Sequence, residues 1–437
     1  MNELQDLDRR HHLHPFTDHR TMHQTGTHVI VRGEGCYLID QTGKRLLDGL
    51  AGLWCVNIGY SNPRVVQAVQ QQMQQLPYYC SFFNTTTEPS IRLAHKLADL
   101  APVRLNHTIF CNSGSEANDT ALKLIRAYNK LRGKPQKTKI LSRTYSYHGV
   151  TLATTSLTGL PTCYQPFDLP LPGFIHVPGP YRYGAKTTLT DEEYGQWCLS
   201  QTRDIIQKEG ADTIAAMFVE PIQGAGGVIV PPKGYLSELR ALLREHEILF
   251  VADEVISGFG RLGDWFASNL WDLDPDILTL AKGVTSGYLP LGATMLSDEI
   301  VETLHQGGYL AHGYTYSGHP TACACALENI AVIEDMGLIQ TTREQTGPYF
   351  QKKLRALKDH PAVGEVRGCQ LIGAIEIKAP GAPNTLGAKA ASIARENGVI
   401  VRGIRDLIAM SPPLIITPPE IDQLFDAVHK TLDSLLI

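Results

Sequence analysis

From residue 88 onward the chain alternates short apolar segments with amphipathic ones, and this alternation limits the possible folds more than any other feature. Helical spacing in "EPSIRLAHKLADLA" is followed by the apolar run "HTIFC" and by a second helical stretch, "SEANDTALKLIRAYNK". Five further β-rich runs follow, interrupted by the helical stretch "YLSELRALLREHEI": "KILSR", "IAAMFVEPI", "ILFVADEV", "DILTLAK" and "GATMLS". This pattern predicts an α/β fold whose large lobe holds a mainly parallel sheet sandwiched by helices.

The pattern changes after about residue 330, where a second, smaller lobe is expected. "VGEVRG" and "QLIGAIEIK" lie close enough in the chain to pair as neighbouring strands, and Thr417, Pro418 and Glu420 mark the start of a last helix by an N-cap, a first-turn proline and a capping-box acid. "HVIVRGEGCYLIDQTGKRLLD" suggests a strand pair in an N-terminal segment too short to be a domain. The predicted division is therefore 1–60 as a segment joining the small domain, 61–330 as the large domain and 331–437 as a small α+β domain.

The composition excludes several classes of partner. A net charge of −5, 43% hydrophobic residues and 19% charged residues are ordinary for a soluble globular protein. Because there is no block of lysine and arginine, we expect neither a nucleic acid nor an anionic membrane as a partner. No apolar run approaches the ~18 residues of a membrane span, and "MNELQDLDRRHHLHP" has no apolar signal core, so a cytoplasmic location is expected.

Cysteine and histidine do not indicate a metal centre in the sequence. The nine cysteines lack paired spacing, and Cys323 and Cys325 fall in a stretch typical of a buried helix, so reduced core thiols are expected. His11, His12 and His14 crowd near the start of the chain, but no H-E-x-x-H or Cys/His ligand set accompanies them. A polar leader is the preferred interpretation, and no metal is predicted. The sequons at Asn84, Asn106 and Asn118 carry no weight without secretion.

A single lysine in "LTLAKGVTSGYLPLGA" raises a question of chemistry. Lys282 lies between an apolar run and a glycine-rich turn, where burying an ammonium costs several kcal/mol unless something compensates. Asp253 ends another apolar run, "LFVAD", and both residues would lie at carboxyl ends of parallel strands, where ligand crevices form. A lysine that forms a Schiff base and an acid that pairs with a pyridinium nitrogen suit pyridoxal phosphate. The two residues alone fit a buried ion pair equally well.

Residues at three other strand ends could belong to the same site as Lys282 and Asp253. "FCNSGSEANDTALKLI" reads as strand, turn and helix, so the free N–H groups of the helix start and two hydroxyls form a candidate phosphate site. Ser113 and Glu116 also fit a plain capping box, and both interpretations can hold together. Tyr147 in "TYSYHGVT" can stack on an aromatic ring, and Glu220 ends one more strand, although neither is distinctive alone.

Taken together, these stretches resemble the class III aminotransferases of fold type I, and within them the amine:pyruvate or ω-transaminase group. The resemblance covers nearly the whole chain, in the order "HPFTD", "GLWCVNIGY", "NSGSEANDTALK", "EPIQGAGGVIVPP", "ADEVISGFGR", "AKGVTSGYLPLGA", "HGYTYSGHP" and "MSPPLIITP". One such motif would be weak, as "QGAGG" fails as a dinucleotide fingerprint, whereas the ordered set is specific.

The resemblance implies roles for individual residues. Lys282 would be the Schiff-base lysine and Asp253 the partner of the ring nitrogen, while Tyr147 and Val255 would cover the two ring faces. Thr315 and Phe82 would be supplied by a second subunit, which implies a homodimer with shared active sites, or a tetramer built from such dimers. The residues implied at the cofactor are Ser113, Gly114, Ser115, Tyr147, His148, Glu220, Asp253, Val255, Lys282 and Thr315, and those at the substrate are Phe16, Trp54, Phe82, Tyr147 and Arg402.

Arg402 in "GVIVRGIRD" matches the arginine of this group that binds the keto-acid carboxylate and swings away for a neutral amine. Guanidinium binds a carboxylate bidentately, and its long stem permits a second position. Arg405 lies three residues further on, and "KAPGAPNTLGAKAASIARENG" is shorter than the usual family insertion, so the choice between these two arginines stays open.

The predicted reaction is transfer of an amino group from a primary amine, a diamine or an ω-amino acid to pyruvate, through ping-pong half-reactions that yield alanine. Lys282 would act as the general base. Three alternatives remain: a decarboxylase or aminomutase with the same cofactor, a non-catalytic relative, and a nicotinamide-dependent dehydrogenase, which the missing glycine fingerprint disfavours. The physiological donor and the enantiopreference do not follow from the sequence.

Overall fold

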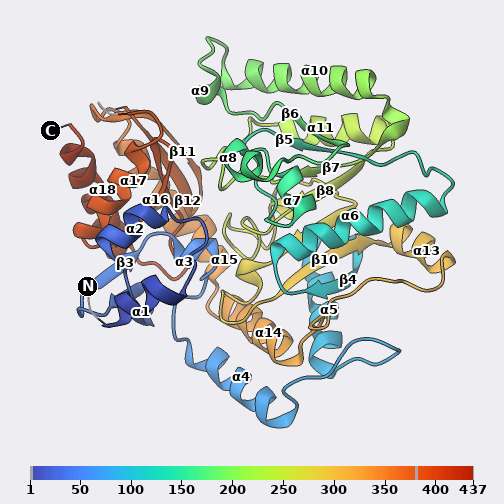
Figure 1. Cartoon of the computed structure of the whole chain (residues 1–437), viewed down its shortest axis with the longest axis horizontal. Coiled ribbons are helices and arrows are strands. Elements are labelled where there is room, and N and C mark those ends of the chain that lie inside the picture. The colour runs from blue at the N-terminus through green and yellow to red at the C-terminus, as the bar shows by residue number, and fades with distance from the viewer. Residues whose placement is uncertain (1–2, 379–381, 437) are drawn as a thin grey trace.

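The computed structural model describes residues 3–378 and 382–436, which form a large lobe and a smaller one (Figure 1). The large lobe is built on a seven-stranded sheet in the order β4-β10-β9-β8-β7-β5-β6. Its strands are β4 (Leu105–Cys111), β5 (Lys139–Arg143), β6 (Phe174–Val177), β7 (Ile214–Val219), β8 (Leu249–Asp253), β9 (Ile277–Leu280) and β10 (Gly292–Ser297). The α/β fold class predicted from the sequence is confirmed.

Within the described chain, β10 runs antiparallel to both neighbours, and the other pairs involving β5 to β9 are parallel. The connection from β9 to β10 covers residues 281–291 and holds no α-helix. A parallel return needs a crossover of a dozen or more residues, usually helical, so the chain comes back antiparallel here. This turn carries Lys282.

Helices cover both faces of the sheet, as the continuously buried, mainly apolar strands at its centre require. In β7, Ala216 and Phe218 pack on one face with α6 (Gly114–Leu131), while Met217 and Val219 join the core on the other face. Among the described residues, no helix is long and apolar enough to cross a membrane. The remaining helices of this lobe are α4 (Pro63–Gln75), α5 (Glu88–Leu100), α7 (Leu152–Leu157), α8 (Pro161–Tyr164), α9 (Arg182–Ala185), α10 (Asp191–Glu209), α11 (Tyr235–Glu245), α12 (Ala267–Leu270), α13 (Asp298–Gln306) and α14 (Pro320–Asp335).

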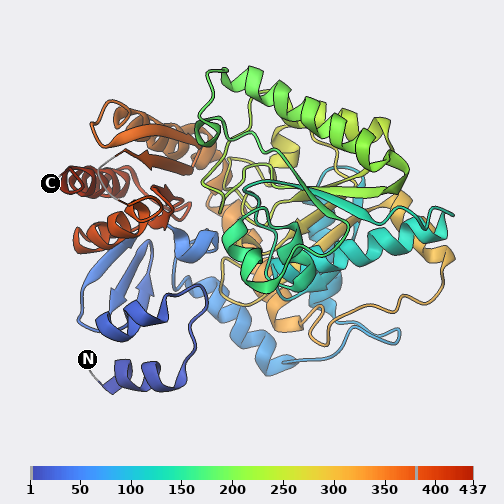
Figure 2. The same cartoon turned by 45° about the horizontal axis from the view of Figure 1, so that its top comes forward.

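The smaller lobe joins the two ends of the chain (Figure 2). One sheet has the order β1-β2-β3-β13, in which β13 from the C-terminal part pairs in parallel with β3 from the N-terminal segment. A second, antiparallel sheet has the order β11-β12-β15-β14. Its β11–β12 pair is the one expected from "VGEVRG" and "QLIGAIEIK". The shared sheet supports the proposed grouping of residues 1–60 with the C-terminal domain.

The elements of this lobe are β1 (Ile30–Glu34), β2 (Tyr37–Asp40), β3 (Arg45–Asp48), β11 (Val363–Cys369), β12 (Ile372–Ile377), β13 (Val399–Ile400), β14 (Arg402–Ile404), β15 (Leu407–Met410), α1 (Glu3–His11), α2 (His19–Thr25), α3 (Ala51–Trp54), α15 (Leu338–Thr341), α16 (Gly347–Ala356), α17 (Leu386–Glu396) and α18 (Pro418–Ser434). The capping box predicted for the last helix is present, since Thr417 and Glu420 cap α18 reciprocally. All nine cysteines are free thiols, and Cys323 and Cys325 are buried in α14, as expected.

Candidate active site

A cavity of about 340 Å³ lies where β7, β8 and β9 end and α6 begins. This is the edge of a parallel sheet at which ligand crevices form. Nine of the residues proposed from the sequence line this cavity: Ser113, Gly114, Ser115, Tyr147, His148, Glu220, Asp253, Val255 and Lys282. Its volume suits a small organic cofactor with a small substrate.

Lys282 occupies the turn that follows β9, in a strained backbone conformation. Its φ is +45°, in the left-handed region, which costs a residue with a side chain on the order of 1–3 kcal/mol unless its surroundings enforce it. Burial lowers the pKa of the Lys282 amine, and charges on Cys55, Asp253 and Glu220 oppose this only partly. Within the described residues no ion pair of Lys282 is found, and its Nζ lies 5.9 Å from the ring centre of Trp54. Because burial disfavours the ammonium form, a lysine held in this way is more readily deprotonated to a nucleophile or base than an exposed one.

Asp253 is held rigidly at the end of β8. Its side chain is 4% exposed, and Oδ2 accepts from Asn118 Nδ2 at 2.8 Å and contacts His148 Nδ1 at 2.7 Å. The backbone N–H of Val255 donates to Oδ1 at 3.2 Å. Thr279 in turn donates to Asn118 Oδ1 at 2.9 Å, which orients the amide so that its N–H₂ group faces the carboxylate. The alternative of a buried Asp–Lys ion pair is not what the structure contains.

Asn118 and Thr279 were missed by the sequence interpretation. Asn118 drew notice only as part of a sequon, although it lies one turn into α6, directly after the proposed phosphate turn. Its side-chain amide also donates to the backbone oxygen of His148 at 2.8 Å, so it joins the two strand ends. No sequence motif marks this role, since the spacing along the chain does not show which atoms the Asn118 side chain will face.

Glu220 links two backbone segments beside the cavity. Its carboxylate accepts from the backbone N–H groups of Tyr147 at 2.9 Å and Gly224 at 3.0 Å, and burial raises its pKa. Burial also raises the pKa of Tyr147 to about 12, so its phenol stays neutral. Glu220 thereby fixes the loop that carries Tyr147 and His148.

The start of α6 offers unused hydrogen-bond donors to the cavity. Ser113 is the N-cap and accepts from the Glu116 N–H at 3.2 Å. Glu116 does not complete a capping box with Ser113, because its carboxylate accepts instead from the backbone and side-chain amides of Asn112 at 2.7 and 2.8 Å. The backbone N–H groups of Gly114 and Ser115 have no partner among the described residues. A side chain at Gly114 would come within 3.0 Å of Val255, so glycine lets Val255 close one side of the cavity.

Trp54 is the substrate position that the fold brings next to Lys282. It is buried, its indole N–H finds no partner in the described part of the chain, and it belongs to a core cluster shared with β12, β15 and Ile256. The cluster packs the small lobe against the cavity wall. Phe16, by contrast, is 69% exposed between α1 and α2 and does not line this cavity.

Phe82 and Thr315 lie apart from Lys282, on two segments that contact each other. Tyr78 donates to the Thr315 backbone oxygen at 2.6 Å, and Gly313 packs so closely on the Phe82 ring that a Cβ there would lie 2.6 Å away. Phe82 and residues 308–313 line a separate hollow of about 960 Å³. Neither residue lines the cavity of its own chain.

The two candidate arginines differ in how they are held. Arg405 donates to the Gly226 backbone oxygen at 2.7 Å, and its guanidinium lies 5.1 Å from the Tyr145 ring and 5.8 Å from the Tyr181 ring. Arg402, at the start of β14, is exposed, and no hydrogen bond or ion pair of its side chain is found among the described residues. Arg405 is thus held by its contacts, whereas the Arg402 guanidinium has no comparable contact among the described residues, although partial burial lowers its pKa.

The side chains of the cavity fit pyridoxal phosphate. Unpartnered amides at a helix N-terminus suit a phosphate, a lysine of lowered pKa suits an aldehyde, and a carboxylate fixed by three donors suits a pyridinium nitrogen.

Comparisons with known proteins give consistent results. The family model "aminotransferase class-III" matches residues 19–432. The chain is 44% identical to a putrescine–pyruvate aminotransferase of Pseudomonas aeruginosa, covering 99% of this chain and 96% of that protein, and 42% identical to a mitochondrial gamma aminobutyrate transaminase of Solanum lycopersicum, covering 96% and 84%.

Solved structures agree. An omega transaminase from Pseudomonas jessenii in complex with PMP superposes with a TM-score of 0.96 at 42% identity, covering 99% of this chain and 98% of that one. An (S)-enantioselective omega-transaminase from Thermomicrobium roseum gives 0.96 at 43% identity, covering 100% and 99%.

Proposed function

The chain belongs to the class III aminotransferase family, and from this premise we propose that it transfers the amino group of a primary amine, a diamine or an ω-amino acid to pyruvate, with alanine as the product. The observation that carries the proposal is that one cavity contains both Lys282, whose amine has no ion-pair partner among the described residues, and Asp253, whose carboxylate is held by hydrogen bonds. The similarity to a putrescine–pyruvate aminotransferase over nearly the whole chain supports this donor class and acceptor.

Class III aminotransferases use pyridoxal phosphate, which supplies an aldehyde that takes up the amino group and a ring that withdraws electrons from the substrate carbon. We propose that Lys282 holds the cofactor covalently and Asp253 holds its ring nitrogen. The N–H groups of Gly114 and Ser115 would bind the phosphate, and Tyr147 and Val255 would enclose the ring. The His148 ring would help to hold the Asp253 carboxylate in place, and Glu220 would position the loop that carries Tyr147 and His148.

Lys282 also serves as the acid–base group. Once an incoming amine has displaced it, the Lys282 Nζ, whose pKa is lowered by burial, would take the proton from the substrate carbon that bears nitrogen and would deliver it to the cofactor carbon that had carried the aldehyde. The half-reaction with pyruvate would run the same transfers in reverse. The Asp253 carboxylate is already held in position by Asn118 and Val255, so the site need not reorganise during the reaction.

Arg402 is proposed to bind the carboxylate of pyruvate. Its exposed, unpaired side chain on β14 can swing toward the cavity when the acceptor enters, whereas Arg405 is committed to Gly226 and two tyrosine rings. A neutral amine needs no such cation, so one site can serve both half-reactions. Trp54 and Phe16 are proposed to limit the size of the donor.

A homodimer with shared active sites is part of the proposal. Phe82 and Thr315 do not reach the cavity of their own chain, and the surface around them exposes large apolar side chains, including Phe83, Tyr309 and Tyr316. Exposed apolar patches of this kind mark interaction surfaces. Assembly into a tetramer and the cytoplasmic location stay predictions.

A donor panel with pyruvate tests the function. Putrescine, β-alanine, 4-aminobutyrate, taurine and a benzylic amine are each incubated with the holoenzyme, and alanine is measured. Alanine formed in step with loss of donor supports a transaminase, while carbon dioxide or an isomerised amine without alanine would indicate a decarboxylase or an aminomutase. The 42% identity to a gamma aminobutyrate transaminase makes 4-aminobutyrate the second candidate donor.

A spectrum separates the remaining alternatives. A visible absorption band that borohydride removes would indicate the covalently held cofactor at Lys282. A chain with no such band would be a non-catalytic relative or a dehydrogenase, and the proposal would be wrong.

A further inference from the structure

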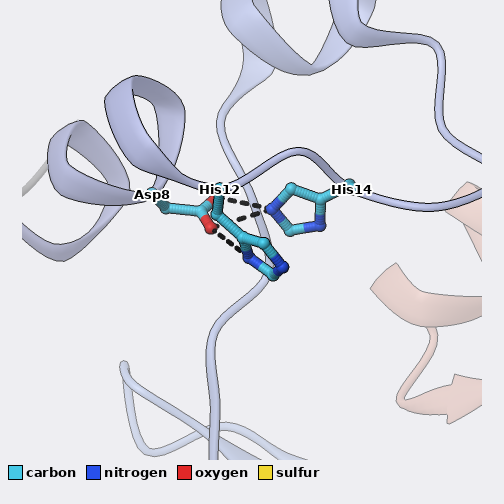
Figure 3. Close-up of side chains that lie close together, drawn as sticks. All are labelled: Asp8, His12 and His14. Carbon is cyan, nitrogen blue, oxygen red and sulfur yellow. Dashed lines mark hydrogen bonds and ion pairs between the residues drawn. The ribbon is translucent and has the colours of Figure 1, made fainter.

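The end of α1 and the segment after it bring three potential metal ligands together (Figure 3). Asp8 lies in α1, and His12 and His14 follow the helix. His14 Nε2 lies 2.8 and 2.9 Å from the two Asp8 oxygens, and His12 Nδ1 lies 3.1 Å from Oδ1. The sequence interpretation favoured a plain polar leader here, because nothing in the sequence singles out Asp8 as the third member.

The spacing of these atoms is close to that of a coordination sphere. One ligand atom from each residue lies within 4.8 Å of the other two. Ligands about 2.0–2.1 Å from a tetrahedral zinc ion are about 3.3 Å apart, so the two His–Asp8 separations need to lengthen by only a few tenths of an ångström to admit the ion. Two imidazoles and a carboxylate leave a fourth position for water.

The free ring nitrogens support the same conclusion. Within the described chain, His12 Nε2 and His14 Nδ1 have no hydrogen-bond partner, so each ring can carry its proton there and present the other nitrogen as a lone pair. Asp8 is 18% exposed and His14 25% exposed, which keeps two of the three ligands out of bulk water. The shielded Thr27 hydroxyl lies near the Asp8 carboxylate and can help to orient it.

A second cluster in the chain lacks this property. His360, His429 and Asp433 are also close together, but His360 Nδ1 accepts the backbone N–H of Ala362 at 3.1 Å. Its proton is therefore on Nε2, which faces Asp433 at 3.0 Å and has no lone pair for a metal. The two clusters look alike in composition, but the second nitrogen of His360 is already occupied by Ala362, so its proton cannot move there to free Nε2 for a metal.

We propose that Asp8, His12 and His14 form a binding site for one zinc ion, or a similar divalent transition metal, that fastens the end of α1 to the segment leading into α2. His19 Nε2 contacts the His14 backbone oxygen at 3.0 Å, so an ion at His14 would also steady the start of α2. Phe16 lies between these two points. The site is separate from the proposed aminotransferase chemistry, and its ion is structural.

The test uses the tag-free holoenzyme after treatment with a chelator. Isothermal titration with zinc chloride should give one saturable site per chain, and magnesium, which prefers oxygen ligands, should give none. Asp8→Asn and the double variant His12→Ala/His14→Ala should weaken zinc binding at least 10–100-fold, the loss that even an outer-shell partner causes. His11→Ala and His429→Ala are matched controls and should bind as the parent does.

Hydrogen exchange gives a second readout. Amides of residues 3–18 should exchange more slowly with zinc in the parent and not in the double variant. Zinc binding that persists in Asp8→Asn and in the double variant, or no saturable binding by the parent, would overturn the proposal and leave ordinary His–Asp ion pairs.

Discussion

Lys282 concentrates two unfavourable features in one residue, a left-handed backbone and a buried amine. Residues strained in this way persist where the surrounding structure enforces them, and they gather at reactive sites. We expect Lys282→Ala to keep the fold and to bind pyridoxal phosphate without a covalent bond, while turnover falls by several orders of magnitude because anchor and base are lost together. Alanine formation from a good donor measures this. Lys282→Arg is the charged control and should be equally inactive; near-parental turnover in either variant would refute the role of Lys282.

Asp253 is expected to depend on its charge and not only on its shape. Asp253→Asn removes the carboxylate but keeps its size, and it sets an amide against the donors of Asn118 and Val255. Loss of a charge-assisted contact to the ring nitrogen should cost about 3 kcal/mol, or more than a hundredfold in turnover. Steady-state rates across the neutral pH range, with circular dichroism as a check on folding, provide the measurement. Asn118→Ala, which loosens the same carboxylate without removing it, should have a smaller effect, and the reverse order would mean that Asp253 is not the partner of the ring nitrogen.

Arg402 and Arg405 can be distinguished because only the acceptor carries a carboxylate next to the reacting carbon. For Arg402→Ala, the half-reaction with a neutral benzylic amine should run at nearly the parental rate. The return half-reaction with pyruvate should weaken by roughly 1.5–3 kcal/mol, chiefly through KM. Single-turnover spectra resolve the two halves. Arg405→Ala is the matched control and should spare both, apart from a loss of stability through Gly226 and the tyrosine rings; a larger pyruvate defect in Arg405→Ala would reverse the assignment.

At the scale of elements, the periodic parts of the fold could be predicted and the connections could not. The runs "KILSR" and "DILTLAK" become β5 and β9 because short apolar β-rich segments have few other stable conformations. "GATMLS" reads in the same way, yet β10 runs antiparallel, since direction depends on the length of the preceding turn. The lysine and aspartate could be found because buried charges are rare in strands. Asn118 and Thr279 could not, because their role depends on which atoms they face across two elements.

Lys137, in the connection before β5 at the sheet edge opposite the cavity, is expected to contribute to the stability of the fold. Lys137 precedes β5 and is buried, and its three N–H donors face four backbone oxygens, those of Ala211, Ile214, His246 and Glu247, at 3.0–3.3 Å from Nζ. Lys137 therefore contacts both the loop that leads into β7 and the loop that leads into β8. Lys137→Met should lower the free energy of unfolding by about 3 kcal/mol, because four buried oxygens lose their donor, and should leave turnover of the folded enzyme unchanged.

The pH dependence of that effect has a definite sign. Burial lowers the pKa of Lys137 from 10.5 to about 8, so between these values the unfolded chain binds more protons than the folded one, and stability rises with pH. Lys137→Met lacks this rise, so the gap between parent and variant should widen from pH 8 upward and stay constant below it. Urea unfolding of both proteins at several pH values measures the gap. Lys139→Met is the control. The partly exposed amine of Lys139 pairs with Glu209, and its loss should lower the free energy of unfolding by at most about 1 kcal/mol.

At the scale of the whole molecule, the cavity depends on both lobes. Buried Arg261 of the large lobe donates to the backbone oxygens of Leu371 and Pro412 and, at 2.9 Å, to Asn57 Oδ1. Trp54 packs in the same region against β12 and β15. The position of β14, and with it Arg402, is therefore set by contacts between the lobes, and sequence reasoning within one lobe could not have placed it.

The shared active site is also a property of the whole assembly, and it can be tested by combining two inactive chains. Thr315 is exposed and is not among the residues that line its own cavity, so in a dimer of the proposed kind it would contact the phosphate bound by the partner. Thr315→Asp should then be nearly inactive, because its carboxylate would repel that phosphate, and Lys282→Ala is inactive for the reason given above. In a heterodimer of the two variants, one site combines the intact Lys282 of one chain with the intact Thr315 of the other.

Random assembly of equal amounts makes half of the dimers mixed, each with one intact site, so co-expression should restore about a quarter of parental activity. Purification through two different affinity tags isolates the heterodimer, whose activity should rise to about half. Activity per chain is measured with pyruvate and the best donor of the panel. If each active site belonged to a single chain, every site in the mixture would still carry one lesion, and no activity would return. Rescue therefore requires that Lys282 and Thr315 of one working site come from different chains.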